Sequence, residues 1–273
     1  MSFIRFTFFL LVTFCLVSCQ EDPITTDPGD LLKVERQNLG DILLDAIKSD
    51  ASNISYYSEE SFPDLYQHFN KLYRQVYQVD RDISDWDTDH EIKVLIIRNK
   101  EQIATCLPGG HLIISQGLAN LFTYEYELIY VMAFEFNLMN EGNLLENMGQ
   151  FVENITELRD LAKNGDPAKA TEIALDILRD QISFEPELTE NIDKLTVDNI
   201  CQNTNFKVDG LREFYGDLIE SEQWFNTRES FSNRINSLVR YMVDQECTGE
   251  NKIRYTSKGE NYYEDIIKDF LGN

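Results

Sequence analysis

The stretch Ile103–Asn140, IATCLPGGHLIISQGLANLFTYEYELIYVMAFEFNLMN, decides the fold of this chain. It begins with a β-branched run, and the tripeptide Pro108–Gly110 that follows predicts a tight turn. His111–Ser115 predicts a second strand after that turn. A short helix opening at Gly117 and a longer, largely apolar helix over Glu125–Met139 are then expected.

Several short motifs of this stretch stand in one register: Leu107-Pro108-Gly109-Gly110-His111, Gly117-Leu118, Glu127-Leu128, Val131 and Ala133-Xaa-Glu135. In that register the stretch resembles the LPGGHIF…TGLL…ELAAVLAHELAH core of the zinc metallopeptidases that include the CAAX prenyl protease, HtpX and BepA (metallopeptidase family forty-eight). The resemblance covers about residues 92–241. It implies a zincin-like fold of the α+β class, mainly helical, with a small three-strand sheet over an HExxH-type helix.

The metal-binding motif of that family is replaced in this chain. Where the family carries His-Glu-x-x-His, the chain has Phe134-Glu135-Phe136-Asn137-Leu138. Two histidines four apart on a helix can both bind one zinc ion, and the glutamate between them acts as general base on the metal-bound water. Phe134 and Leu138 have no lone pair to donate, so we expect both to pack in the core. Glu135 is left in a vestigial general-base position.

The resemblance also implies a third zinc ligand, a glutamate in a second helix that reads Glu-x-x-Ala-Asp. The segment Thr189–Val197 fits this register, with Asp193 on the aspartate and Thr189 on the ligand glutamate. Glu190 or Glu187 could replace that ligand only if the helix turned by roughly a third to half of a circle. All three ligand positions therefore hold residues that do not bind zinc, and we expect no cofactor.

Two further expectations concern the surroundings of Glu135. A carboxyl on a buried helix is costly unless it is protonated or paired, so we predict a basic or hydrogen-bonding partner, with Arg234 and Arg228 as candidates. In the resembled family the strand before the Pro-Gly-Gly turn is a sheet edge that pairs with extended substrate. Main-chain pairing needs no metal, so that edge is a candidate peptide-binding site, unless its own loop covers it. Its residues here are Ile103, Ala104, Thr105, Cys106 and Leu107.

The composition limits the classes of partner that we expect for this chain. The 273 residues contain 48 Asp and Glu against 24 Lys and Arg, and 42% of them are hydrophobic. That hydrophobic fraction is enough for a packed core. A field of negative sign repels phosphate backbones, so we expect no nucleic-acid partner.

The first 18 residues indicate a signal peptide. Arg5 gives a positive start, and Phe6–Val17 is an apolar run too short to span a membrane as a permanent helix. Leu16-Val17-Ser18-Cys19 resembles the lipobox of bacterial lipoproteins, which implies cleavage before Cys19 and acylation of that cysteine. The alternative is an ordinary secretory signal with an incidental cysteine.

The predicted cleavage before Cys19 divides the rest of the chain into two segments. Residues 19–30 would be the lipidated cysteine and a tether, and residues 31–273 a metallopeptidase-like domain. Gln20 is not the aspartate that resembles an inner-membrane retention signal, so we expect the outer membrane, with a periplasmic or surface-exposed domain. After processing, Cys106, Cys201 and Cys247 remain and allow at most one disulfide. Cys106 and Cys201 are expected to be buried thiols.

Apolar periodicity predicts further helices on both sides of the central stretch. They are expected over Asp30–Ser49, from Pro63 to about Val79, as one long helix over Leu144–Lys163, over Ala168–Ile182, and over Tyr262–Leu271.

Three functions fit the sequence. The first is a non-catalytic pseudopeptidase of the cell envelope that binds polypeptide or a partner protein, in a chaperone or scaffold-like role. The second is an active metalloendopeptidase with a shifted ligand set, for example Glu135, Glu141 and His111, which would need zinc. The third is a purely structural envelope lipoprotein, which predicts a covered groove beside Ile103–Leu107.

Overall fold

The computed structural model describes residues 33–50, 52–79, 92–122, 125–141, 144–180, 186–203, 236–238 and 240–241. These residues form a mainly helical α+β structure with one small mixed sheet of three strands, which confirms the predicted class. The predicted signal peptide, Cys19, the arginines Arg228 and Arg234, and the predicted helix Tyr262–Leu271 lie outside the described residues.

The sheet consists of β1 (Val94–Ile97), β2 (Ala104–Cys106) and β3 (Leu112–Ser115), in the order β1-β3-β2. β3 is the central strand and pairs parallel with β1 and antiparallel with β2. The outer side of β1 is covered, because Tyr57 N–H donates to Ile96 O at 2.9 Å and Arg98 N–H donates to Ser55 O at 2.7 Å. Within the described part of the chain, β2 is therefore the edge without a second strand, as predicted.

The turn between β2 and β3 has the geometry that its sequence dictates. Gly110 N–H donates to Leu107 O at 3.1 Å, and Gly109 has φ 80° and ψ 1°, the values of the third residue of a type II turn. A helix, α2 (Lys33–Ser49), lies directly against this turn. A Cβ atom at Gly40 of α2 would stand 1.8 Å from the Pro108 carbonyl oxygen, so only glycine permits this approach.

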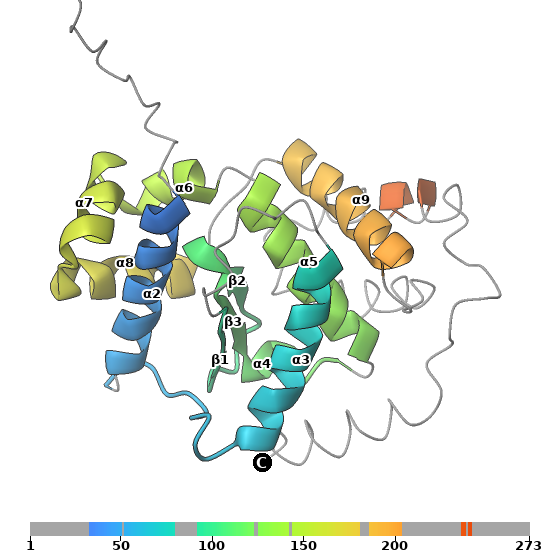
Figure 1. Ribbon diagram of the computed structural model, residues 1–273, viewed down its shortest axis with the longest axis horizontal. Helices are drawn as coiled ribbons and strands as arrows, with labels where there is room; N and C mark the ends of the chain where they lie inside the picture. The colour runs from blue at the N-terminus through green and yellow to red at the C-terminus, as the bar shows by residue number, and fades with distance from the viewer. Residues whose placement is uncertain are drawn as a thin grey trace, which may run out of the picture. The chain divides into compact units, whose positions relative to one another are not determined.

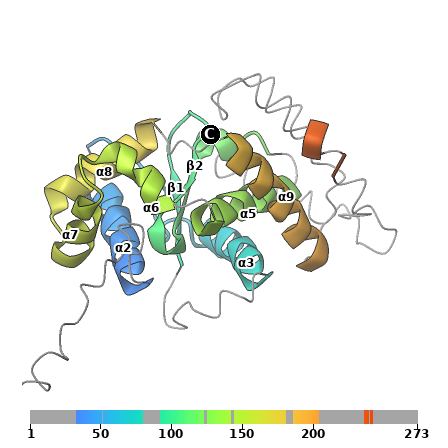
Figure 2. The ribbon, with the colours of Figure 1, turned by 90° about the horizontal axis from the view of Figure 1, so that it is seen from above.

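Helices lie on both sides of the sheet (Figures 1 and 2). On one side, α2 packs against α7 (Thr156–Asn164) and α8 (Pro167–Asp180). On the other side, α5 (Glu125–Glu141) packs against α3 (Pro63–Val79) and α9 (Pro186–Asn203). The short helix α4 (Gln116–Ala119) follows β3 and is capped by Ser115, whose hydroxyl accepts from Leu118 N–H at 3.1 Å. None of the described helices is both long and apolar enough to cross a membrane.

The predicted single helix over Leu144–Lys163 is wrong. The chain forms α6 (Leu144–Asn147), a 3₁₀ turn over Met148–Phe151, and α7, which begins only at Thr156. The Asn154 side chain accepts from Thr156 N–H at 3.0 Å and starts a new helix there. The apolar spacing runs across this break, so periodicity alone predicts a continuous helix. The predicted end of this helical stretch near Lys163 is confirmed, since α7 ends at Asn164 and the following Gly165 adopts the left-handed conformation with φ 65°.

Candidate functional site

The helix α5 holds Phe134–Leu138, the segment that the resemblance aligns with the family's metal-binding motif, and this segment is buried. Phe134 is 3% exposed and Leu138 is 5% exposed, and both belong to the hydrophobic core. The ring of Phe134 stacks on Tyr130, with centroids 6.3 Å apart. The prediction that Phe134 and Leu138 pack in the core is confirmed.

The segment that holds Thr189 forms α9, which packs along α5 (Figure 1). Thr189 is half-buried in its first turns. Asp193, one turn further, accepts a hydrogen bond from the Tyr130 hydroxyl at 2.7 Å. Glu190 accepts from Lys194 at 2.9 Å and from the Ser237 hydroxyl at 2.6 Å, while Glu187 is exposed.

The residues at the three ligand positions do not fit the zinc ion that the resemblance implies. The side chains of Phe134 and Leu138 carry no donor atom, and the neutral hydroxyl of Thr189 is not among the groups that bind zinc in proteins. In the described ranges, no three His, Cys, Asp or Glu side chains are grouped so that they could hold a metal ion.

His111, a member of the alternative ligand set, has both ring nitrogens in use. Its Nδ1 accepts from the Lys93 backbone N–H at 3.1 Å, so its Nε2 carries the proton and donates to the Asp41 carboxylate at 3.0 Å. The ring is completely buried. The arrangement joins the residue before β3 to α2 and leaves no lone pair for a metal. The side chain of Glu141, also in that set, lies outside the described part.

Glu135 has the hydrogen-bonding partner that burial predicts. Glu135 is 8% exposed and its carboxyl accepts a hydrogen bond from the Cys106 backbone N–H, while Arg234 and Arg228 lie outside the described ranges. Burial raises the pKa of Glu135 to about 8, and the Cys106 N–H acts in the opposite direction. Most molecules therefore hold this carboxyl protonated at neutral pH, a form that cannot accept a proton from water as a general base.

The predicted peptide-binding edge is buried along its whole length. Ile103, Ala104, Thr105, Cys106 and Leu107 are each at most 4% exposed. The Tyr73 hydroxyl donates to Gly110 O at 2.8 Å and lies 3.4 Å from Cys106 Sγ, and the Cys106 thiol lies 3.8 Å from Met139 Sδ. Burial raises the pKa of the Cys106 thiol far above its usual range, so this cysteine is no nucleophile. Side chains of α3 and α5 thus lie against this edge, whereas the alternative interpretation expected the edge's own loop to cover it.

A second buried titratable group lies where α3 meets the first turn of α5. His68 is 3% exposed, and its Nε2 stands 3.4 Å from a Glu125 carboxylate oxygen. Burial lowers the pKa of His68 to about 4, and the nearby Lys71 acts in the same direction. Desolvation thus outweighs the Glu125 contact, and the imidazole is neutral at pH 7.

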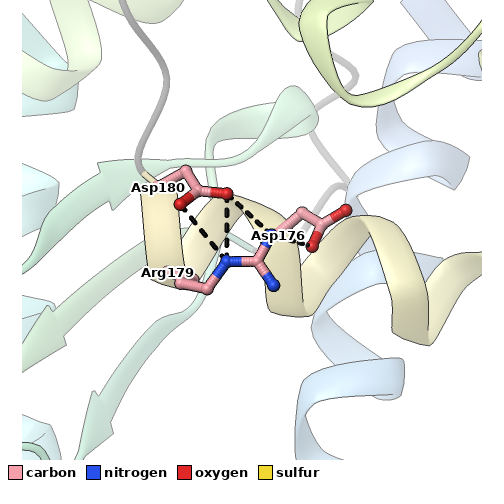
Figure 3. Close-up of polar contacts among 3 residues, drawn as sticks. All are labelled: Asp176, Arg179 and Asp180. Atoms are coloured by element: carbon pink, nitrogen blue, oxygen red, sulfur yellow. Dashed lines mark hydrogen bonds and ion pairs between the residues drawn. The ribbon is translucent and has the colours of Figure 1, made fainter.

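The densest ion-pair cluster of α8 is exposed. Arg179 Nη2 lies 2.7 Å from carboxylate oxygens of both Asp176 and Asp180 (Figure 3). Arg179 and Asp180 are more than half exposed. Exposed pairs of this kind contribute little to stability, and no second feature of the described residues marks this cluster as a binding site.

Cys201 corrects one prediction. It is disulfide-bonded and half-buried, not a buried thiol. Cys106, by contrast, is a free buried thiol as predicted. Because Cys106 is free, the partner of Cys201 lies outside the described residues. The helical position of Cys201 gave no sign of this bond, since its partner is not a neighbour in sequence.

Neither the protein-family models nor the curated proteins include a match to the sequence of this chain.

Proposed function

We propose that this chain is an envelope lipoprotein with a zincin-like, catalytically inactive domain that acts by binding polypeptide or a partner protein. The observation that carries the proposal is the set of contacts that the Glu135 carboxyl makes. The carboxyl at the general-base position bonds to the Cys106 backbone N–H, between two core residues, Phe134 and Leu138. It contributes to packing and has no metal-bound water to activate.

The zincin-like part of the proposal is supported by the arrangement of α5. This helix packs against β2, β3 and the turn between them, and α9 packs along it. The motif register around Pro108–Gly110 and Glu135 predicts the same neighbours. The helix at the HExxH position therefore lies beside the small sheet, with the helix of Asp193 as its partner.

The location in the envelope is supported by two features. Leu16–Cys19 resembles a lipobox, so Cys19 would carry lipid and anchor the domain to the outer membrane. The disulfide of Cys201 is typical of an oxidising compartment outside the cytoplasm. If Cys15 leaves with the signal peptide and Cys19 is acylated, Cys247 is the remaining partner for Cys201.

The covered β2 edge bears on how a polypeptide would bind. Pairing with Ile103–Leu107 requires that the side chains covering this edge move first. A purely structural lipoprotein also predicts a covered edge, so burial alone does not separate these two functions. Capture of a partner does.

Photo-crosslinking in intact cells tests the proposal. A photoreactive amino acid at exposed positions near the sheet, such as Lys100 and Glu101, is expected to trap a discrete protein partner. The matched control places the same group at Arg179, on the exposed face of α8. A chain that traps no partner from either region, while it reaches the membrane normally, contradicts the binding function and favours the structural one.

An active metalloendopeptidase is the second candidate. It predicts that the purified chain cleaves casein and that Glu135→Gln abolishes the cleavage. The proposal predicts no cleavage by either protein. The Gln variant keeps an acceptor oxygen for the Cys106 N–H, so it is expected to fold. A loss of cleavage would therefore result from the missing carboxylate and not from unfolding.

A further inference from the structure

The hydrogen bonds of β2 fix which of its backbone groups face away from the sheet. Leu107 N–H donates to His111 O at 2.7 Å, and Ser115 N–H donates to Ile103 O at 2.9 Å. In an antiparallel ladder, residues that bond the partner strand alternate with residues whose N–H and C=O point the other way. Cys106 therefore points its backbone N–H away from β3, toward the outer side of β2.

The group found at that N–H is the carboxyl of Glu135. The strand alternation and the Glu135 contact are independent observations, and they place the same N–H at the same edge. Met139, one helical turn after Glu135, has its sulfur 3.8 Å from Cys106 Sγ, so one face of α5 lies against this residue. The contact is therefore part of a packed helix–strand junction.

A carboxyl oxygen accepts a hydrogen bond much as a backbone carbonyl does. An added strand would pair with β2 through the same outward N–H, because strand addition uses the free backbone groups of an edge. The two acceptors compete for one donor. A buried N–H without any acceptor is costly, so Glu135 would leave only when another acceptor takes its place.

We propose that Glu135 is an intramolecular latch on β2: its carboxyl takes the hydrogen-bonding place that the backbone carbonyl of an extended polypeptide would occupy on Cys106. This inference rests on the proposed polypeptide-binding function and names the group that must move. The residue at the general-base position thus keeps the edge closed in the resting protein.

Two variants of equal charge test the latch in the full-length chain in detergent. Glu135→Gln keeps the acceptor, whereas Glu135→Leu fills similar volume and removes it. Labelling with [15N]cysteine gives at most five amide signals, because the chain has 5 cysteines, and loss of one signal in Cys106→Ser assigns Cys106. The Cys106 amide is expected to exchange with solvent at least about tenfold faster in the Leu variant than in the Gln variant.

The binding arm uses reduced, carboxamidomethylated ribonuclease A with a fluorescent label as the unfolded polypeptide. The Leu variant is expected to bind it at least about tenfold more tightly than the Gln variant, since only the Leu variant offers the free N–H. Because both variants carry the same charge, general electrostatic attraction to the acidic chain cancels in this ratio.

Equal Cys106 amide exchange in the two variants overturns the latch, and so does equal affinity for the probe. Failure of the proposed function has a different signature: the wild type traps no partner in cells, whatever the amide exchange shows. If the Leu variant does not fold, a measurement on the wild-type protein tests the latch. Its Cys106 amide shift is expected to titrate with the Glu135 pKa of about 8, and a shift that does not titrate overturns the latch.

Discussion

Two buried polar residues of α5, Glu135 and Asn137, stand two positions apart and serve different neighbours. Asn137 faces α9, where its amide donates to the Thr196 hydroxyl at 3.0 Å and accepts from the Asn199 amide at 3.2 Å. Glu135 faces β2 and accepts from the Cys106 N–H. The α9 contact joins groups that do not titrate, whereas the β2 contact holds a carboxyl whose pKa is raised. Only the β2 contact should therefore make stability depend on pH.

The largest expected effect is the pH dependence that Glu135 imposes. Its pKa is about 8 in the folded chain against 4.5 ordinarily, so its favourable contribution is complete below pH 4.5 and is lost as the pH rises to 8. At 1.36 kcal/mol per pKa unit, the loss is at most about 5 kcal/mol. Glu135→Gln cannot titrate, so its stability advantage over the wild type should grow across this range in urea unfolding. If the free energies of unfolding of the two proteins change with pH in parallel, the contact of Glu135 with β2 does not make stability depend on pH.

His68 should give the opposite slope, with a smaller effect. Its pKa of about 4 in the folded chain lies below the ordinary 6.5, so its contribution is complete above pH 6.5 and is lost as the pH falls to 4. The loss is about 3 kcal/mol at most. His68→Gln should flatten this acid limb in the same urea titration. A variant as acid-sensitive as the wild type would show that other groups govern that limb.

The α9 side is expected to respond to mutation without a pH dependence. Asn137→Ala removes two buried hydrogen bonds and should lower the free energy of unfolding by about 2 kcal/mol. The loss should be the same at pH 5.5 and pH 8, because amides and hydroxyls do not ionise there. Asn199→Ala, which removes only the longer bond, is the milder control. A loss that changes with pH would mean that Asn137 is coupled to a titrating group.

The smallest effect is expected at the exposed cluster of α8. Arg179→Ala should leave the free energy of unfolding nearly unchanged, although Arg179 lies 2.7 Å from two carboxylates, because solvent screens exposed ion pairs. Urea unfolding at low and moderate salt measures it. A loss as large as that of Asn137→Ala would show that burial does not decide how much a polar contact stabilises this fold.

Local chemistry predicted most elements of the fold. Pro108–Gly110 dictates its turn, Gly165 ends α7, and the apolar spacing over Glu125–Met139 gives α5. The break before α7 was not predicted because apolar residues continue through it. Its local sign, the hydrogen bond from Thr156 N–H to the Asn154 side chain, involves a single side chain within a longer pattern.

The candidate site was predicted in part. The motif register identified Phe134, Glu135 and Leu138, and simple desolvation predicted that Glu135 needs a partner. The partner itself, the N–H of Cys106, is a backbone group and leaves no trace in the sequence. The bond between His111 and Asp41 joins residues 70 positions apart, a separation that periodicity cannot bridge.

The most direct test of the account is the zinc content of the full-length chain, purified without chelator and measured by mass spectrometry against protein concentration. With Phe134 and Leu138 in the core and Glu135 bonded to β2, we predict that zinc is far below one equivalent and does not change in Glu135→Gln. One tightly held zinc ion per chain, lost when Glu135 or His111 is replaced, would contradict the account.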